Sequence, residues 1–469
     1  MNIIQITPGA GTMYCGNCFR DNALVVALRK LGHEVLMVPL YLPLTLDEED
    51  QSAGTPIFFS GINVYLEQKS ALFRQAPDWF HRLLASRGLL KWAAGKTAKT
   101  RAEDLGDITL SMLRGEDGNQ ARELNELIGW LKPQSKPDVI CLSNALLLGL
   151  APRLKSELGA PIVCTLQGED AFLDALPETH RARCWKTLAG RAADVDLFIA
   201  PSRYFGDLMR QRLSLPAGQV RVVYNGINLD GYSDECAEGG GRRSELGRQR
   251  LAPTSDLRPP TSDLRPPAPV LGYFARMCKE KGLDTLVDTY IELRRRDRVK
   301  SLKLRIGGSC GPADEPFVDA LRARLNGARV LTDVQFCPNL DRPGKLEFLR
   351  SLSIFSVPAL YGEAFGLYVI EALAAGVPVV QPRSGAFPEL IDATGGGVLC
   401  NPGDLQALAD SIEELLLNPA RARSLRDTGR SAVFERFSAA AMATETLRHL
   451  EGVTRPVPEL KPHLAVRSA

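Results

Sequence analysis

The sequence lacks long apolar runs and an excess of charge. No stretch approaches the roughly 18 consecutive apolar residues that a membrane-spanning helix requires. Its 57 lysines and arginines are balanced by 55 aspartates and glutamates, so the net charge of +2 gives no reason to expect nucleic acid as a partner. Residues 1–6 read as a strand and lack the charged opening of a signal peptide. We therefore expect a cytoplasmic protein.

Metal-binding and disulfide patterns are also lacking. The ten cysteines are scattered through predicted strands and helices, which is typical of reduced thiols in a cytosolic protein. Cys15 and Cys18 form one C-x-x-C at a predicted helix start, but no second C-x-x-C or histidine pair follows. No metal site is therefore expected. A redox pair and a structural or cleft-lining role remain open for these two cysteines, and the second is favoured.

Length and hydrophobic periodicity predict two α/β domains. A chain of 469 residues exceeds one ordinary core. In residues 1–228, short apolar strands alternate with amphipathic helices, which predicts a parallel sheet. The same alternation restarts at residue 270 and continues to residue 437. The predicted strands are 2–7, 33–38, 138–143, 161–166, 196–201 and 221–224 in the first half, and 270–275, 302–308, 334–338, 354–357 and 377–381 in the second.

Three segments interrupt this alternation. Residues 229–269 are rich in proline and glycine and contain the heptapeptide TSDLRPP twice in tandem, which predicts a linker insertion without a catalytic role. A proline-rich docking segment is the less favoured alternative. Residues 438–469 contain a last helix and a proline-rich tail that we expect to fray. Residues 68–115 are predicted to be helical. Basic and aromatic side chains interleave in 68–101, so a membrane-surface face and an acceptor lid compete there with the favoured interpretation, two helices packed on the sheet.

The stretch 361–371 holds two glutamates, Glu363 and Glu371, on either side of a short joint. A strand is predicted before this stretch, and a helix is predicted to begin inside it. Glu363 therefore belongs to the loop at the end of the strand, and Glu371 belongs to the helix. Between them lie backbone N–H groups at a helix N-terminus, where anions bind readily. This arrangement would suit a nucleotide-sugar. Spacing alone equally allows two glutamates that only decorate the fold.

Other unusual loops also follow strand ends, where ligands of open α/β sheets bind. In the second half, such loops hold the cations Arg276 and Lys281, which could bind a diphosphate. Glycines and acidic side chains mark the remaining loops. In the first half, the turn with Gly9 and Gly11 is interpreted as backbone that approaches a ligand, with a plain tight turn as the alternative. The other loop residues are Gly307, Gly385 and Glu389 in the second half, and Gln167, Glu169 and Asp170 in the first.

These motifs together resemble glycosyltransferase family 4. The matching residues of the second half are Gly272-Tyr-Phe-Ala-Arg276, Lys281-Gly282, Glu363-Ala-Phe-Gly-Leu, Glu371-Ala-Leu-Ala-Ala-Gly-Val-Pro-Val-Val380, Gly385 and Pro388-Glu389. Those of the first half are Pro8-Gly9-Ala10-Gly11, Gln167-Gly-Glu-Asp170, Ser202 and Tyr224-Asn-Gly-Ile-Asn228. The resemblance covers nearly the whole chain, except residues 68–101 and the linker insertion.

The resemblance implies a fold and a reaction. Members of the family have the GT-B fold, in which two Rossmann-like parallel-sheet domains face a central cleft. Here residues 1–228 would form the acceptor-side domain and residues 270–437 the nucleotide-sugar-binding domain, and we expect the helix after 438 to cross back to the first. Family members are retaining, metal-independent hexosyltransferases that use a nucleotide-sugar as co-substrate and no cofactor. A UDP-sugar is expected because UDP is the family's common choice.

The family's functional residues carry over to matching positions. By this resemblance, Arg276 and Lys281 neutralise the leaving diphosphate and Glu363 faces the donor sugar, which makes these three the candidate catalytic residues. Glu371 would hold the donor ribose. The candidate donor-binding residues are Gly9, Gly11, Gln167, Gly307, Phe365, Gly366, Leu367, Glu371 and Glu389. The acceptor-side candidates are Asn22, Glu169 and Asp170.

One position departs from the family. Members commonly have His-Gly or His-Asp where this chain has Gln167-Gly168, and glutamine can hydrogen-bond a hydroxyl but cannot take a proton. The donor sugar therefore stays open. A catalytically silent nucleotide-sugar-binding protein and a sugar-nucleotide epimerase of the same fold are the alternative functions. The acceptor is a sugar, a lipid or a small molecule, and contact of residues 68–101 with the inner face of a membrane would suit a lipid.

Overall fold

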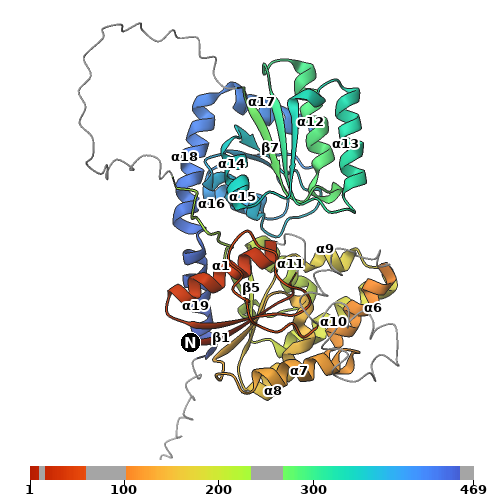
Figure 1. Ribbon diagram of the computed structural model, residues 1–469, viewed down its shortest axis with the longest axis vertical. Coiled ribbons are helices and arrows are strands. Elements are labelled where there is room, and N and C mark those ends of the chain that lie inside the picture. Colours follow the sequence, from red (N-terminus) through yellow and green to blue (C-terminus); the bar gives the residue numbers. More distant parts are fainter. Residues whose placement is uncertain (10–15, 60–101, 234–267, 455–469) are drawn as a thin grey trace, which may run out of the picture.

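The computed structural model describes residues 1–9, 16–59, 102–233 and 268–454. Gly11 and Cys15, the basic-aromatic segment 68–101, the repeats of the linker insertion and the tail from residue 455 lie outside the described residues. Figure 1 shows two sheet domains, one above the other, with helices packed around each sheet. None of the described helices has the length and apolar character needed to cross a membrane.

The first domain is built on a six-stranded sheet of order β2-β1-β3-β4-β5-β6, in which every pairing is parallel. Strands β3, β4 and β5 are almost wholly apolar and fully buried, as expected for a parallel sheet covered on both faces. The strands are β1 (Asn2–Thr7), β2 (Glu34–Pro39), β3 (Val139–Leu142), β4 (Ile162–Thr165), β5 (Leu197–Ala200) and β6 (Val220–Val222). The described α-helices are α1 (Gly16–Lys30), α6 (Ala102–Arg114), α7 (Ala121–Leu131), α8 (Ala151–Leu158), α9 (Glu169–Asp174), α10 (Glu178–Arg191) and α11 (Arg203–Leu213).

The second domain repeats this architecture with the order β12-β11-β10-β7-β8-β9, again all parallel. Its strand order reverses between β7 and β10, which is the type of position where such sheets bind ligands. The strands are β7 (Val270–Phe274), β8 (Lys303–Gly308), β9 (Val334–Pro338), β10 (Ile354–Phe355), β11 (Val379–Pro382) and β12 (Gly397–Cys400). The helices are α12 (Leu283–Arg296), α13 (Glu315–Gly327), α14 (Arg342–Arg350), α15 (Leu367–Ala374), α16 (Phe387–Thr394), α17 (Leu405–Leu417), α18 (Pro419–Arg436) and α19 (Ala439–Thr454). The two sheets confirm the predicted fold class.

The chain crosses between the domains twice, and the two crossings run side by side. The N–H of Ile227 donates to the carbonyl of Phe437 at 2.9 Å, and the N–H of Ala439 donates back to the Ile227 carbonyl at 2.8 Å. Helices α18 and α19 then run along one side of the molecule from the second domain to the first (Figure 1). There α19 packs its apolar face, including Met442 and Leu450, against α1.

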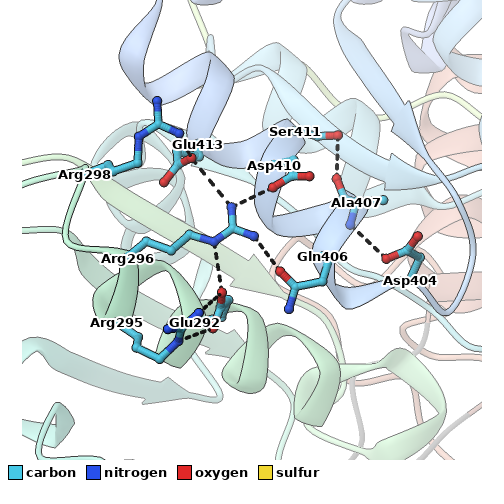
Figure 2. A network of polar contacts seen from close by, with 10 residues as sticks. All are labelled: Glu292, Arg295, Arg296, Arg298, Asp404, Gln406, Ala407, Asp410, Ser411 and Glu413. Atoms are coloured by element: carbon cyan, nitrogen blue, oxygen red, sulfur yellow. Dashed lines mark hydrogen bonds and ion pairs between the residues drawn. The ribbon is translucent and has the colours of Figure 1, made fainter.

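A polar cluster fixes α12 to α17 on the outside of the second domain. Figure 2 shows the guanidinium of Arg296 donating to Glu292 at 3.0 Å and to Gln406 and Asp410 at 2.6 Å each. Arg296 is the last residue of α12, where a cation also interacts favourably with the helix dipole. The cluster holds in place α12, whose opposite end begins at Leu283, two residues after the candidate catalytic residue Lys281.

Candidate active site

Two adjoining cavities lie between the domains, beyond the carboxyl ends of the strands. We name them the Glu363 chamber and the Glu371 chamber after the glutamate that lines each one. Their cavity volumes are about 340 and about 180 Å³, and each is lined by residues of both domains. Small-molecule pockets measure roughly 300–1000 Å³, so the smaller chamber alone is below this range, and a ligand of nucleotide-sugar size needs both chambers. The residues that line both chambers are Gly16, Ala275, Arg276, Ser309, Leu367 and Tyr368.

Lys281 and Glu363 form the central pair of the Glu363 chamber. The Lys281 Nζ lies 2.6 Å from Oε2 of Glu363, and both side chains are largely buried. The hydroxyls of Tyr368 and Tyr361 donate to the same oxygen at 2.7 and 3.3 Å. The ammonium also lies 5.4 Å from the centre of the Tyr368 ring and 5.0 Å from that of the Tyr361 ring. Burial opposes the charged form of Lys281, but Glu363 and Tyr361 together outweigh it and the pKa of Lys281 is raised. Lys281 therefore keeps its positive charge beside the Glu363 carboxylate.

The loop after β10 brings Glu363 to the start of α15. Gly366 is the N-cap of α15 and has a φ of +92°, a left-handed conformation that glycine adopts without strain. Leu367 then begins the helix, and the first N–H groups of a helix have no intrahelical partner. Phe365, Gly366 and Leu367 all line the Glu363 chamber. A carboxylate, an ammonium and free helix amides thus meet in one place, which suits a phosphate next to hydroxyls.

Arg276 stands at the junction of the two chambers. Its guanidinium binds Asp314, the N-cap residue of α13, with Nη2 at 2.9 Å and Nε at 3.2 Å from the same oxygen. The carboxylate is buried, whereas about half of the arginine side chain is exposed to the cleft. Hydrogen bonding to Asp314 raises the pKa of Arg276. Asp314 therefore fixes the direction of a permanent cation that both chambers share.

Glu371 lies one turn into α15 and binds Lys345, which comes from α14. The Lys345 Nζ is 3.0 Å from Oε1 of Glu371 and 2.6 Å from Oδ2 of Asp47, a first-domain residue. Next to this group, Arg342 of α14 binds Glu48 of the first domain at 2.7 Å. Burial opposes the charge of Lys345, but Glu371, Tyr232 and Asp47 together outweigh it and the pKa of Lys345 is raised.

Sequence reasoning did not identify the four charged residues that pair across the Glu371 chamber, which are Asp47, Glu48, Arg342 and Lys345. One signal was available, because the loop with Asp47 and Glu48 follows β2, and Arg342 and Lys345 follow β9. The rule that strand-end loops carry the site applies to them as well as to Arg276. No sequence pattern predicts which of these acidic residues pairs with which basic residue.

Of the first-domain candidates on the loop after β4, two line the Glu363 chamber and one does not. Gln167 and Asp170 line it, and the Gln167 side-chain amide donates to the carbonyl of Ser143 at 2.9 Å. Glu169 points inward instead and is buried. It accepts from the N–H groups of Ala145 and Gln167, at 2.8 Å each, and burial raises its pKa. Glu169 therefore ties two loops together and does not face the acceptor side.

Asn22 and Gly9 support the cleft from behind it. Asn22 is buried, donates to the carbonyl of Glu49 at 3.0 Å and accepts from the N–H of Gln51 at 2.9 Å. It thereby holds the loop that carries Asp47. Gly9 has a φ of +73°, and a Cβ there would lie 1.9 Å from the carbonyl oxygen of Leu42. This close packing explains the glycine, and neither residue is among the described residues that line the chambers.

Two donor-binding candidates of the second domain also lie away from the chambers. Glu389 accepts from the N–H groups of Arg203 and Tyr204, at 3.0 and 3.2 Å, and from the hydroxyl of Tyr224 at 2.8 Å. It therefore caps α11 of the first domain. Gly307 lies within β8, where a Cβ would lie 2.6 Å from the ring of Phe274. Its neighbour Gly308 lines the Glu371 chamber in its place. Across the described ranges, no three histidine, cysteine or carboxylate side chains converge as metal ligands would.

Comparisons with known proteins agree with this architecture. The model "Glycosyl transferases group 1" matches residues 259–432, and the model "Glycosyltransferase Family 4" matches residues 109–230. A D-inositol 3-phosphate glycosyltransferase of Corynebacterium aurimucosum is 29% identical over 276 residues, which are 58% of this chain and 60% of that relative. A GDP-mannose-dependent alpha-(1-6)-phosphatidylinositol monomannoside mannosyltransferase of Mycolicibacterium smegmatis is 29% identical over 66% of this chain and 74% of its own length. Sucrose-phosphate synthase from Thermosynechococcus elongatus has a similar fold, with a TM-score of 0.67 and 20% identity over 96% of this chain and 98% of that one.

Proposed function

We propose that this chain, which belongs to the family 4 type of GT-B glycosyltransferases, transfers a hexose from a nucleotide-diphosphate sugar to an acceptor hydroxyl. The observation that carries the proposal is the meeting of Arg276, Lys281 and the start of α15 beside Glu363. Two fixed cations and free amides suit a leaving diphosphate, whose stabilisation is the main requirement of this reaction.

The two chambers suggest how the donor would lie. Arg276 lines both, so the diphosphate belongs at their junction, with the nucleoside in the Glu371 chamber and the sugar in the Glu363 chamber. All three contacts of the Glu363 carboxylate involve Oε2, so Oε1 is the oxygen available to a sugar hydroxyl. In the same way, Lys345 binds Oε1 of Glu371, so Oε2 is available to the ribose.

The proposed reaction is retaining and metal-independent, as the resemblance to family 4 implies. The acceptor hydroxyl would attack the anomeric carbon on the face from which the phosphate leaves. The bond from carbon to the phosphate oxygen breaks, the bond to the acceptor oxygen forms, and the leaving phosphate takes the hydroxyl proton. Gln167, which cannot accept that proton, is then no obstacle. Arg276 and Lys281 would supply the positive charge that a metal ion supplies elsewhere.

The identity of the nucleotide base and that of the acceptor are to be determined by experiment. UDP is the expectation from the sequence, and GDP competes with it because the name of the mycobacterial relative contains GDP-mannose. The names of both curated relatives mention an inositol compound, so inositol phosphates belong among the acceptors to be tested beside simple sugars. The chain aligns with only about 60% of the corynebacterial relative, which is a reason to test the substrates broadly.

The proposal is tested by nucleotide binding followed by turnover. In a thermal-shift screen of UDP, GDP and ADP, the preferred nucleotide at ~100 times its Kd stabilises the folded protein by roughly 2.7 kcal/mol. The corresponding nucleotide-hexoses are then incubated with the acceptors, and released nucleotide and glycoside are measured. We expect one nucleotide to bind and its hexose to be transferred. Binding without turnover would favour a catalytically silent protein, a changed sugar on the nucleotide an epimerase, and no binding at all would overturn the nucleotide site.

A further inference from the structure

Two ion pairs cross the cleft at the Glu371 chamber. Both connect α14 of the second domain to the loop after β2 of the first. Lys345 pairs with Asp47 at 2.6 Å, and Arg342 pairs with Glu48 at 2.7 Å. The loop is itself held from behind by Asn22, through hydrogen bonds to residues 49 and 51. The two acids are therefore presented to α14 by a supported loop.

The two pairs differ in what their cations touch next. The ammonium of Lys345 also binds Glu371 at 3.0 Å, so one cation holds one carboxylate from each domain. Side-chain exposure in this trio is 4% for Asp47, 9% for Lys345 and 19% for Glu371, so the contacts are shielded from water and salt. Arg342 instead donates to the backbone carbonyls of Asn228 and Asp230.

Sharing the ammonium changes what Glu371 can do. If Lys345 bound Glu371 alone, the pair would be neutral and the lysine could rotate about its long side chain to follow the carboxylate. With Asp47 on its other side, the ammonium is held in one place and the trio keeps one net negative charge. Glu371 is then oriented, and it remains a strong acceptor for hydroxyl groups.

We propose that Asp47 is a positioning residue, which acts through Lys345 to orient Glu371 toward the ribose hydroxyls of the donor. This inference rests on the proposed function, because it takes the Glu371 chamber as the nucleoside site. Its consequence is that ribose recognition by the second domain depends on the approach of the first. Contact between the domains and recognition of the nucleoside are thereby coupled.

The test compares Asp47→Asn with its matched control, Glu48→Gln. Each variant removes one charge from the same loop and from one ion pair between the domains, but only Asp47 reaches Glu371 through a shared cation. Calorimetry measures the Kd of UDP and GDP and of their 2′,3′-dideoxy forms, which lack the ribose hydroxyls. Hydrogen bonds to a charged group are worth enough for the wild-type protein to prefer the ribose form by roughly tenfold or more. We expect this preference to fall to about twofold in Asp47→Asn and to persist in Glu48→Gln.

The outcomes separate this inference from the proposed function. If the wild-type protein binds neither UDP nor GDP, the proposed function fails. If the wild type prefers the ribose form and Asp47→Asn retains that preference, Asp47 has no positioning role. Equal loss of the preference in Glu48→Gln would assign the effect to domain closure in general and would also overturn the specific role of Asp47. Should Asp47→Asn fail to fold, as judged by its melting curve, Asp47→Ser removes the same charge. The same ratio of Kd values, for the nucleotide and its 2′,3′-dideoxy form, then tests the role of Asp47.

Discussion

The two chambers of the cleft are assembled from different parts of the molecule. In the Glu363 chamber the ionic partners all belong to the second domain, because Lys281 meets Glu363 and Arg276 meets Asp314. In the Glu371 chamber a first-domain acid, Asp47, takes part in the central group of charges. These ion pairs of the Glu363 chamber thus lie within a single domain, whereas the Asp47–Lys345 pair of the Glu371 chamber joins the two domains.

This difference suggests that the two chambers have different roles in the reaction. Charges that stabilise a leaving group are most effective when they are held in place before the reaction, and the Glu363 chamber meets that condition. Recognition of the nucleoside can depend on domain approach without weakening that preorganisation. Variants of the Glu363 chamber should therefore lower kcat, and variants of the Glu371 chamber should mainly weaken donor binding.

The largest effect is expected when a cation of the Glu363 chamber is removed. Lys281→Ala and Arg276→Ala should each lower turnover by at least ~100-fold, because each removes charge stabilisation from the leaving diphosphate. Lys279→Ala is the matched control, since Lys279 lies in the same short 3-10 turn as Lys281 but is exposed. Initial rates at saturating donor measure the effect. Near-normal rates in both cation variants would show that the Glu363 chamber does not bind the diphosphate. The contrast drawn between the two chambers would then be wrong.

A smaller effect is expected from the hydroxyls that hold Glu363. Tyr368→Phe removes a 2.7 Å hydrogen bond to the carboxylate, and a hydrogen bond to a charged group is worth about 1.5–3 kcal/mol, so kcat should fall roughly tenfold or more. Tyr361→Phe removes a longer contact of 3.3 Å to the same oxygen and should cost less. Separate kcat and KM values check this order. A rise in KM alone would place Tyr368 in donor binding rather than in preorganisation.

Much of this arrangement follows from the sequence by one rule. Parallel strands end at one edge of their sheet, so the loops with Arg276, Lys281, Glu363 and Glu371 were expected to converge, and the structure brings all four to one cleft. The rule concerns the backbone alone. It states which loops gather at the edge but not which way each side chain in them points.

Sequence reasoning was wrong or silent at positions whose role depends on side-chain direction or on contacts with the other domain. Glu169 begins α9 just beyond the end of β4, but its side chain turns inward to accept two backbone N–H groups. Of the two glycines that end β8, Gly307 packs against Phe274, whereas Gly308 lines the Glu371 chamber. The contact between Asp47 and Lys345 joins two domains whose relative placement no periodicity encodes.

Glu389 offers the mildest test, because it joins the domains without lining either chamber. Its carboxylate accepts two N–H groups at the start of α11, where negative charge is favoured by the helix dipole. Glu389→Gln keeps the shape and removes the charge, so it should lower the free energy of unfolding by about 1 kcal/mol. The donor KM should stay within about twofold of the wild-type value, as expected for a residue outside the nucleotide site. Urea unfolding and donor titration measure the two quantities. A tenfold rise in KM at unchanged stability would instead show that this carboxylate reaches the donor, and that contacts between the domains outside the Glu371 chamber also take part in nucleotide recognition.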